Sequence, residues 1–364
     1  MASNIYHLLK FLPMLVVVKS LQPIRAPVHT LLLCRHGDSI WNGGMTGNFE
    51  RFTGWTNVPL SQKGRQEAKA AANALVSCPL DIDACFVSAM ARAQDTLREC
   101  VHAINQSGKM QPRIIVDYRL NERHYGALQG YIKDQVGRGL FGHDPDDVKR
   151  WRKKWSAVPP QLSDDDPRRR DELDLWPEFC GGENNIPRGE SLDMVAKHRI
   201  RPFLDDVLNP VMEEASQTKG RPSTGLIVGH KNSLRALLGV ICDVEHDMAA
   251  LEVLESLKIP TGTPLVLRYQ RTKEGKYKVY DILEKEQQHT ANTMDIRKSN
   301  SERSITPHPS IPICSLKNYV PSNEQFFGEW SRSPTLIEQG GNFDITKLSA
   351  TELMWCKAPL PEQD

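Results

Sequence analysis

The chain has 364 residues, and two of its histidines lie at the ends of apolar runs. Arg35 and His36 follow the run from Val28 to Cys34, and His230 follows Leu226–Gly229. A neutral imidazole can attack phosphorus as a nucleophile, and arginine binds phosphate oxygens through two parallel hydrogen bonds. If both runs are strands that end at one edge of a sheet, these residues form a site for binding and transferring a phosphoryl group.

A second candidate motif runs from Arg119 to Gly130 and places Glu122 among cations and aromatic residues. A carboxyl group there can act as a general acid and base for a hydroxyl that gains or loses a phosphoryl group. Arg123 and Tyr125 can hold a substrate carboxylate or phosphate. The alternative is a turn that contains only a structural salt bridge.

The elements that must position these side chains alternate between strands and helices. Predicted strands cover residues 28–34, 83–88, 114–116 and 226–228, with a late hairpin of 264–269 and 277–283. Composition and spacing predict helices over residues 62–76, 90–104, 191–208 (N-cap Ser191) and 232–241 (an Asn or Ser cap). This alternation predicts an α/β fold with a largely parallel sheet.

Three segments interrupt or flank this pattern. Residues 163–172 form a block of charges, which we interpret as a solvated loop rather than a site. Residues 1–27 contain no acidic residue and form a basic leader that resembles a transit peptide or a poor secretory signal. We expect a catalytic domain over residues 28–285, followed by a polar, irregular extension over 286–364.

Composition excludes several classes of protein. The net charge is +1, with 39% hydrophobic and 25% charged residues, as in soluble globular proteins. The balance of charges argues against a generic nucleic-acid binder, and the apolar leader segment is too short to span a bilayer. None of the eight cysteines forms a C-x-x-C pair or shows zinc spacing, so we expect buried, reduced thiols.

The chain resembles the cofactor-dependent phosphoglycerate mutases of the histidine phosphatase superfamily over roughly residues 28–285. The stretches that carry the resemblance are Leu33–Asn42, Arg51–Trp55, Leu60–Gly64, Leu120–Gly130, Asn232–Leu237 and Ile259–Val266. The resemblance implies a single three-layer α/β domain, with a mostly parallel sheet and helices on both faces. It also implies interconversion of 3-phosphoglycerate and 2-phosphoglycerate, a reaction of glycolysis and gluconeogenesis.

Roles for individual residues follow from the same resemblance. His36 would be the nucleophile, primed by 2,3-bisphosphoglycerate, and Glu122 would donate and accept the proton. The phosphoryl group would be surrounded by Arg35, Arg92 and His230. The other substrate-binding residues would be Gly37, Ser39, Asn42, Thr53, Gly54, Arg123, Tyr125, Lys133, Arg152, Lys153, Lys231 and Asn232. No metal is expected, because histidine and arginine would do its work.

The chain departs from the family pattern at several positions. Lys231 stands where the family usually has glycine, Lys153 where it has arginine, and Asp38 where it has glutamate. The loop over residues 43–50 is longer than usual. These departures leave open a bisphosphoglycerate mutase or phosphatase, or another histidine phosphatase. A scaffold that binds partners through the 286–364 tail is disfavoured by the intact His36, Glu122 and His230.

Further expectations concern assembly and location. We expect a small phosphorylated acid as the binding partner, and no nucleic acid or membrane. A homo-oligomer, dimer or tetramer, is typical of the family. The basic leader favours a cytoplasmic or mitochondrial protein.

Overall fold

A computed structural model describes residues 26–42, 50–280 and 314–315 of the chain. Its sheet has the strand order β3-β2-β4-β1-β5-β6, and β7 also pairs with β5. The strands are β1 (His29–Arg35), β2 (Ala84–Val87), β3 (Arg113–Val116), β4 (Thr224–Gly229), β5 (Leu265–Arg271), β6 (Tyr277–Tyr280) and β7 (Cys314–Ser315). Each predicted strand is present, with bounds within two residues of those predicted, and residues 281–283 at the predicted end of the hairpin lie outside the described residues.

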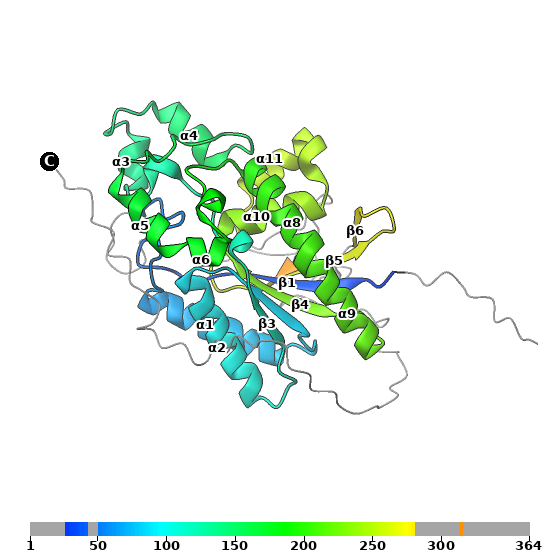
Figure 1. Cartoon of the computed structure of the whole chain (residues 1–364). Coiled ribbons are helices and arrows are strands. Elements are labelled where there is room, and N and C mark those ends of the chain that lie inside the picture. The colour runs from blue at the N-terminus through cyan, green and yellow to red at the C-terminus, as the bar shows by residue number, and fades with distance from the viewer. Residues whose placement is uncertain (1–25, 43–49, 281–313, 316–364) are drawn as a thin grey trace, which may run out of the picture.

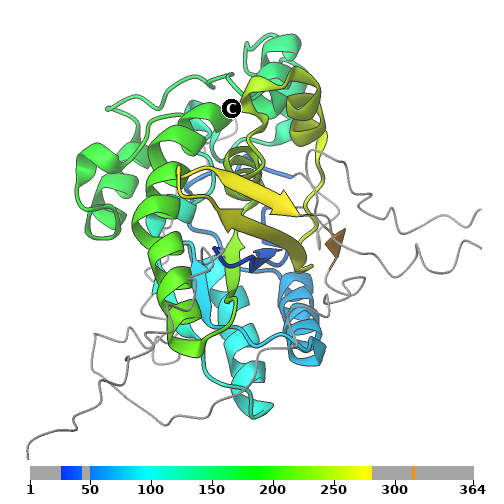
Figure 2. The same ribbon diagram turned by 90° about the vertical axis from the view of Figure 1, so that its right-hand side faces the viewer.

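The sheet is parallel in its centre and antiparallel at one edge. Strand β4 lies between β1 and β2 and runs parallel to both, and β3 runs parallel to β2. Strand β5 pairs antiparallel with β1, and β6 antiparallel with β5, so the predicted hairpin forms this edge. Figure 2 faces this edge, with β6 in yellow.

Helices cover both faces of the sheet, as expected (Figure 1). The α-helices are α1 (Gln62–Ser77), α2 (Ala91–Gln106), α3 (Lys133–Gly137), α4 (Pro145–Lys153), α5 (Pro167–Leu175), α6 (Pro177–Cys180), α7 (Leu192–Val195), α8 (Arg201–Phe203), α9 (Asn209–Lys219), α10 (Lys231–Ile241) and α11 (Met248–Ser256). Figure 1 shows α1 and α2 on one side of the sheet and α8, α9 and α10 on the other. The chain therefore has the single three-layer α/β architecture that the sequence predicts.

Strand β1 shows how the two layers of the core arise. Its side chains point alternately to opposite faces. Leu31 and Leu33 belong to the apolar cluster on the side of α10, and Leu32 and Cys34 to the cluster on the side of α1 and α2. All four are fully buried. The continuous apolar run of this strand is thus explained by burial on both faces.

The predicted helix over 191–208 is longer in the structure. Helical turns continue from α7 to the end of α9 at Lys219, through π-helical turns at Ala196–Ile200 and Leu204–Leu208. Pro202 and Pro210 lie just after these turns. Proline lacks an N–H and displaces a carbonyl of the preceding turn, and wider π turns accommodate this change. The predicted N-cap is confirmed, since Ser191 Oγ accepts a hydrogen bond from the Met194 amide at 3.0 Å.

Two local predictions were wrong. The helix predicted over 232–241 begins one residue earlier, and its N-cap is His230 rather than an Asn or Ser. The charged segment 163–172 is not a solvated loop throughout, because α5 begins within it at Pro167 and is capped by Asp166. Arg169 and Glu172 of this helix are buried. Their charges are tolerated there because the two side chains pair with each other and with polar groups of the interior.

The remaining predictions about segments fall largely outside the described residues. These include the leader 1–27 beyond its last two residues, the loop 43–49, and the extension 286–364 apart from the two residues of β7. Within the described residues, no helix is long and apolar enough to cross a membrane. The described cysteine side chains are free thiols, buried except for the partly buried Cys242.

Candidate active site

The carboxyl ends of the parallel strands β1 and β4 bring the two histidines together. Arg35 pairs with Gly229 in the ladder, and the His36 amide donates to the Gly229 carbonyl at 3.0 Å. The imidazole centroids of His36 and His230 are 4.9 Å apart, with the ring planes at 58°. The sequence prediction that both histidines lie at one edge of the sheet is therefore confirmed.

A cavity of about 480 Å³ opens at this edge of the sheet. Among the predicted site residues, it is lined by Arg35, His36, Asn42, Thr53, Gly54, Arg92, Glu122, Tyr125, Lys133, Arg152, Lys153, Lys231 and Asn232. The other lining residues are Glu50, Lys154, Arg235, Glu252, Glu255, Ser256 and Lys258. Cations outnumber carboxylates in this lining, which suits an anionic ligand.

His36 is held in its neutral form. Its Nδ1 donates to the Gly37 carbonyl oxygen at 2.6 Å, so that Nε2 keeps the lone pair. Burial, and the charges of Arg92 and Arg35, hold the pKa of His36 well below its usual value. The unprotonated ring is the form that can attack phosphorus.

Gly37 supports His36 without lining the cavity. Its amide donates to Thr96 Oγ1 at 3.0 Å, and its carbonyl accepts from His36. A Cβ on Gly37 would lie 2.2 Å from the carbonyl oxygen of Gly64. Only glycine allows this close approach between the loop after β1 and the first turn of α1.

Two arginines lie beside the histidines. Arg92, in the first turn of α2, is 1% exposed and donates to the carbonyls of Thr56 and Gly54 at 2.9 and 3.0 Å. Arg35 donates to the Ile259 carbonyl at 3.2 Å. The Nε atoms of both arginines are buried and have no partner among the described residues. Burial lowers the pKa of Arg92 to about 10, so it remains a cation at neutral pH.

His230 is fully buried behind the cavity surface. Its Nε2 lies 2.8 Å from Ser88 Oγ, and that hydroxyl donates to Asn121 Oδ1 at 2.8 Å. Because the hydroxyl proton is directed to Asn121, Nε2 is the nitrogen that donates to Ser88. Burial and the charge of Arg92 hold the pKa of His230 well below its usual value.

Glu122 reaches the cavity from the segment after β3. Its Oε1 accepts from the amides of Arg123 at 2.8 Å and Asn232 at 3.1 Å. The two amides thus fix the carboxylate through Oε1 where Glu122 lines the cavity. The Glu122 carbonyl accepts from Trp55 Nε1 at 2.7 Å and from the Arg199 guanidinium at 3.2 Å, so the backbone is held as well.

Tyr125 and its neighbours form the wall next to Glu122. The Asn232 amide group donates to the Tyr125 hydroxyl at 2.9 Å, and the Arg123 guanidinium lies 4.6 Å from the centre of the Tyr125 ring. Burial alone would raise the pKa of Tyr125, but the charges of Arg123 and Lys133 outweigh it and lower that pKa. The wall therefore presents an environment that favours negative charge.

Lys231 brings a further cation into the cavity from the first residue of α10. Burial, and the charge of Arg235 one helical turn further on, lower its pKa to about 8. A cation at a helix N-terminus is also disfavoured by the helix dipole. An anionic ligand would relieve both effects.

Four predicted residues do not line the cavity: Gly37, Ser39, Arg123 and His230. Ser39 is buried, and its hydroxyl donates to Asn42 Oδ1 at 2.5 Å, which orients that lining residue. Arg123 is fully buried, and its guanidinium donates to the Trp151 carbonyl at 2.7 Å.

Sequence reasoning missed several residues that shape the site. Arg235 lines the cavity, and its position four residues after Lys231 on one helix was a usable signal. The buried pair of Arg199 and Glu190, 2.8 Å apart, holds the backbone at Glu122. No local signal identifies that pair, because its role depends on contacts across about 77 positions of the chain.

Within the described residues, no group of three or more histidine, cysteine, aspartate or glutamate side chains has the arrangement of a metal site. The expectation of metal-free chemistry stays a prediction.

Comparisons with known proteins add an independent line of evidence. The model of the histidine phosphatase superfamily (branch 1) matches residues 31–170. The 2,3-bisphosphoglycerate-dependent phosphoglycerate mutase of Hamiltonella defensa subsp. Acyrthosiphon pisum (strain 5AT) is 35% identical over 242 residues. That match covers 66% of this chain and 87% of the relative.

Solved structures with a similar fold include a mycobacterial glucosyl-3-phosphoglycerate phosphatase, with 22% identity and a TM-score of 0.47, covering 70% of this chain and 97% of the other. A phosphoglycerate mutase from Bacillus anthracis str. Sterne has 19% identity and a TM-score of 0.44, covering 70% and 92%.

Proposed function

This chain belongs to the histidine phosphatase superfamily, and on that basis we propose that it is a phosphoglycerate mutase that depends on 2,3-bisphosphoglycerate. The proposed reaction interconverts 3-phosphoglycerate and 2-phosphoglycerate, with His36 as the phosphorylated residue. It would serve glycolysis and gluconeogenesis.

One observation carries this proposal: His36, with its lowered pKa, and the carboxyl group of Glu122 line the same cationic cavity. A mutase needs both, because a phosphoryl group and a hydroxyl proton must each be held by the enzyme and returned. The 35% identical relative, a protein named as such a mutase, supports the same proposal.

The proposed reaction begins with a phosphoryl group on Nε2 of His36. The free hydroxyl oxygen of the bound acid attacks phosphorus, the N–P bond breaks, and Glu122 Oε2 takes the hydroxyl proton. Nε2 then attacks the phosphoryl group on the other oxygen of the acid. That O–P bond breaks, and its oxygen regains the proton from Glu122. Both residues end as they began, with His36 phosphorylated and Glu122 ionised.

Charge stabilisation during each transfer is assigned to Arg35 and Arg92, and the neutral ring of His230 is assigned the placement of His36, 4.9 Å away between ring centroids. The buried, unpartnered Nε atoms of the two arginines are donors for the phosphoryl oxygens. Donors that are already oriented stabilise developing charge without the cost of rearrangement. The remaining anionic groups of the acid are assigned to the outer cations, Lys231, Arg152 and Lys153 among them.

The cavity also fits the proposed cofactor. 2,3-Bisphosphoglycerate, when bound, supplies the phosphoryl group that primes His36. Its two phosphates and carboxylate require cations at two or more places. The cations of the lining lie near the histidines (Arg35, Arg92), on α10 (Lys231, Arg235) and at the end of α4 (Arg152, Lys153).

The direct test is mutase activity in an assay coupled to enolase, with and without added 2,3-bisphosphoglycerate. We expect activity with 3-phosphoglycerate that rises with the cofactor concentration and then saturates. Absence of activity in both conditions would reject the proposal.

A second candidate function is transfer of the phosphoryl group to water, as in a phosphatase or a bisphosphoglycerate phosphatase. The cavity favours its consideration, because its volume of about 480 Å³ leaves room for water beside a bound ligand. The same groups would act, with Glu122 taking the proton from water. The rate of phosphate release, compared with the rate of isomer formation, separates the two reactions.

A further inference from the structure

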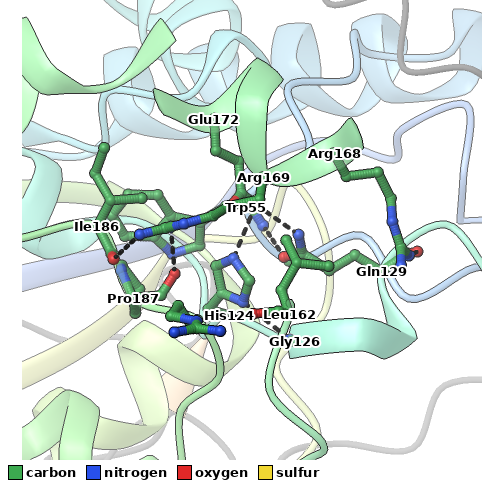
Figure 3. Close-up of polar contacts among 12 residues, drawn as sticks. Trp55, His124, Gly126, Gln129, Leu162, Arg168, Arg169, Glu172, Ile186 and Pro187 are labelled. Carbon is green, nitrogen blue, oxygen red and sulfur yellow. Dashed lines mark hydrogen bonds and ion pairs between the residues drawn. The ribbon is translucent and has the colours of Figure 1, made fainter. Parts of the chain in front are cut away.

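We propose that Glu172 on α5 is a positioning residue for Glu122. It acts through a buried network that contains His124, Gln129 and Trp55 (Figure 3). The inference depends on the proposed role of Glu122 as the proton donor and acceptor. It assigns a function to the charged segment 163–172, whose composition is typical of a solvated loop.

The Glu172 carboxylate is buried, with 6% of the residue exposed. Its Oε1 accepts from His124 Nε2 at 2.8 Å and from Gln129 Nε2 at 2.8 Å. Because the Gly126 amide donates to His124 Nδ1 at 2.9 Å, the ring hydrogen lies on Nε2 and points at the carboxylate. Glu172 therefore acts as an acceptor toward both neighbours, which fixes their orientation.

Arg169, one helical turn before Glu172, balances this buried charge. Its guanidinium lies 3.5 Å from Glu172 Oε2 and donates to the carbonyls of Pro187 and Ile186 at 3.1 and 3.2 Å. An unpaired buried carboxylate would be strongly destabilising. The pair thus anchors α5 to the segment around residue 186 and holds Glu172 in place.

Three hydrogen bonds connect Glu172 to the backbone of Glu122, and the first of them is the bond from Gln129 Nε2 to Glu172. The Gln129 side-chain oxygen accepts from the Trp55 amide at 2.7 Å, and Trp55 Nε1 donates to the Glu122 carbonyl at 2.7 Å. A second connection is covalent, because His124 lies two residues after Glu122. Trp55, His124 and Gln129 are at most 1% exposed. In such dense packing, a shift at one end displaces the other.

The chemical consequence concerns the proton that Glu122 donates to a leaving oxygen. A phosphate ester with a poor leaving group needs that proton in the transition state, whereas one with a good leaving group needs it much less. Misplacement of Glu122 should therefore slow the hydrolysis of phenyl phosphate more than that of p-nitrophenyl phosphate. A general loss of folded enzyme would slow both equally.

The experiment compares kcat/KM for these two esters in the full-length chain and in Glu172→Ala. In Glu172→Ala we expect kcat/KM for phenyl phosphate to fall about 100-fold, the scale of a misplacement near 1 Å. We expect kcat/KM for p-nitrophenyl phosphate to fall only about 10-fold. Glu172→Gln keeps an oxygen acceptor, so it should retain most of the kcat/KM for phenyl phosphate that Glu172→Ala loses. Asp174→Asn, an exposed carboxylate on the same helix, is the matched control and should equal the wild type.

Trp55→Phe provides a second variant in case Glu172→Ala does not fold. It keeps an aromatic ring and removes the Nε1–H donor to Glu122, so the same selective loss with phenyl phosphate is expected. Equal losses with both esters, in either variant, would overturn the inference and leave Glu172 a purely structural role.

The test of Glu172 and the test of the proposed mutase reaction have distinguishable outcomes. Wild-type enzyme that hydrolyses both esters but shows no mutase activity would reject the proposed substrate, while the ratio of the two ester rates still tests Glu172.

Discussion

The rings of His36 and His230 lie 4.9 Å apart, at the ends of two adjacent parallel strands. Both are at most 3% exposed, and burial together with the charge of Arg92 lowers the pKa of each. Two cationic rings at this distance beside Arg92 would repel one another. The geometry therefore favours two neutral imidazoles, one with a free Nε2 and the other bonded to Ser88.

We predict different effects for substitution of the two histidines. His36→Gln should abolish acid-labile phosphoenzyme, because Nε2 of His36 is the proposed phosphoryl acceptor. His230→Gln should keep the label but form it up to about 10²-fold more slowly, because the ring that packs against His36 is lost and the nucleophile is less well placed. Rapid-quench labelling with a radioactive phosphoryl donor measures both. Persistent label in His36→Gln would assign the nucleophile to another residue.

The buried state of His36 predicts a pH-dependent stability. In the unfolded chain its pKa is about 6.5, and in the folded protein it is lowered by burial, Arg92 and Arg35. Below about pH 6.5 the unfolded state therefore binds a proton at this residue that the folded state does not. As the pH is lowered further, the free energy of unfolding falls by about 1.4 kcal/mol per pH unit until the folded-state pKa is reached.

The measurement is urea unfolding of wild type and His36→Gln at several values between about pH 7 and pH 5. The variant should lose stability less steeply as the pH falls, since the other buried histidines are common to both proteins. Parallel curves would mean that His36 is protonated in the folded state.

Lys231 should set the affinity for an anionic ligand. Lys231→Met removes one charged hydrogen bond from the cavity, and we expect the KM for 2,3-bisphosphoglycerate to rise about tenfold or more. In the wild type, the KM should also rise above about pH 8, where the free enzyme loses this charge. Lys231→Arg should not show that rise.

Lys149→Met is the matched control, because Lys149 is exposed on α4 and does not line the cavity. An equal increase of KM in both variants would mean that only the net charge matters.

Gly37→Ala should destabilise the protein by about 1–3 kcal/mol, the usual cost of an overpacked position. The added Cβ would lie 2.2 Å from the Gly64 carbonyl oxygen, which is backbone and can move little. Activity should fall as well, because the Gly37 carbonyl orients His36. Urea unfolding and the coupled assay measure the two effects.

Gly137→Ala serves as the comparison, since an added Cβ there meets no atom within 4 Å. It should be neutral or stabilising by up to about 1 kcal/mol. Similar destabilisation in both variants would contradict the role of close approach at Gly37.

The fold class and the proximity of the two histidines could be predicted from the sequence. Apolar runs such as Val28–Cys34, each followed by a helical segment, predict parallel strands. Since parallel strands present their carboxyl ends at one edge, Arg35, His36 and His230 were expected together. These inferences succeed because they depend on local periodicity and on a general rule of sheet topology.

The contacts that hold Glu122 could not be predicted, because they join parts of the chain that meet only in the folded protein. Its carboxylate bonds to an amide 110 positions away, and its backbone to Arg199 and Trp55. The burial of Glu172 is a similar case, because its partner His124 lies 48 positions earlier. The composition of residues 163–172 predicts exposure. Burial of such charges becomes favourable only when distant parts of the chain supply hydrogen-bond donors that replace water.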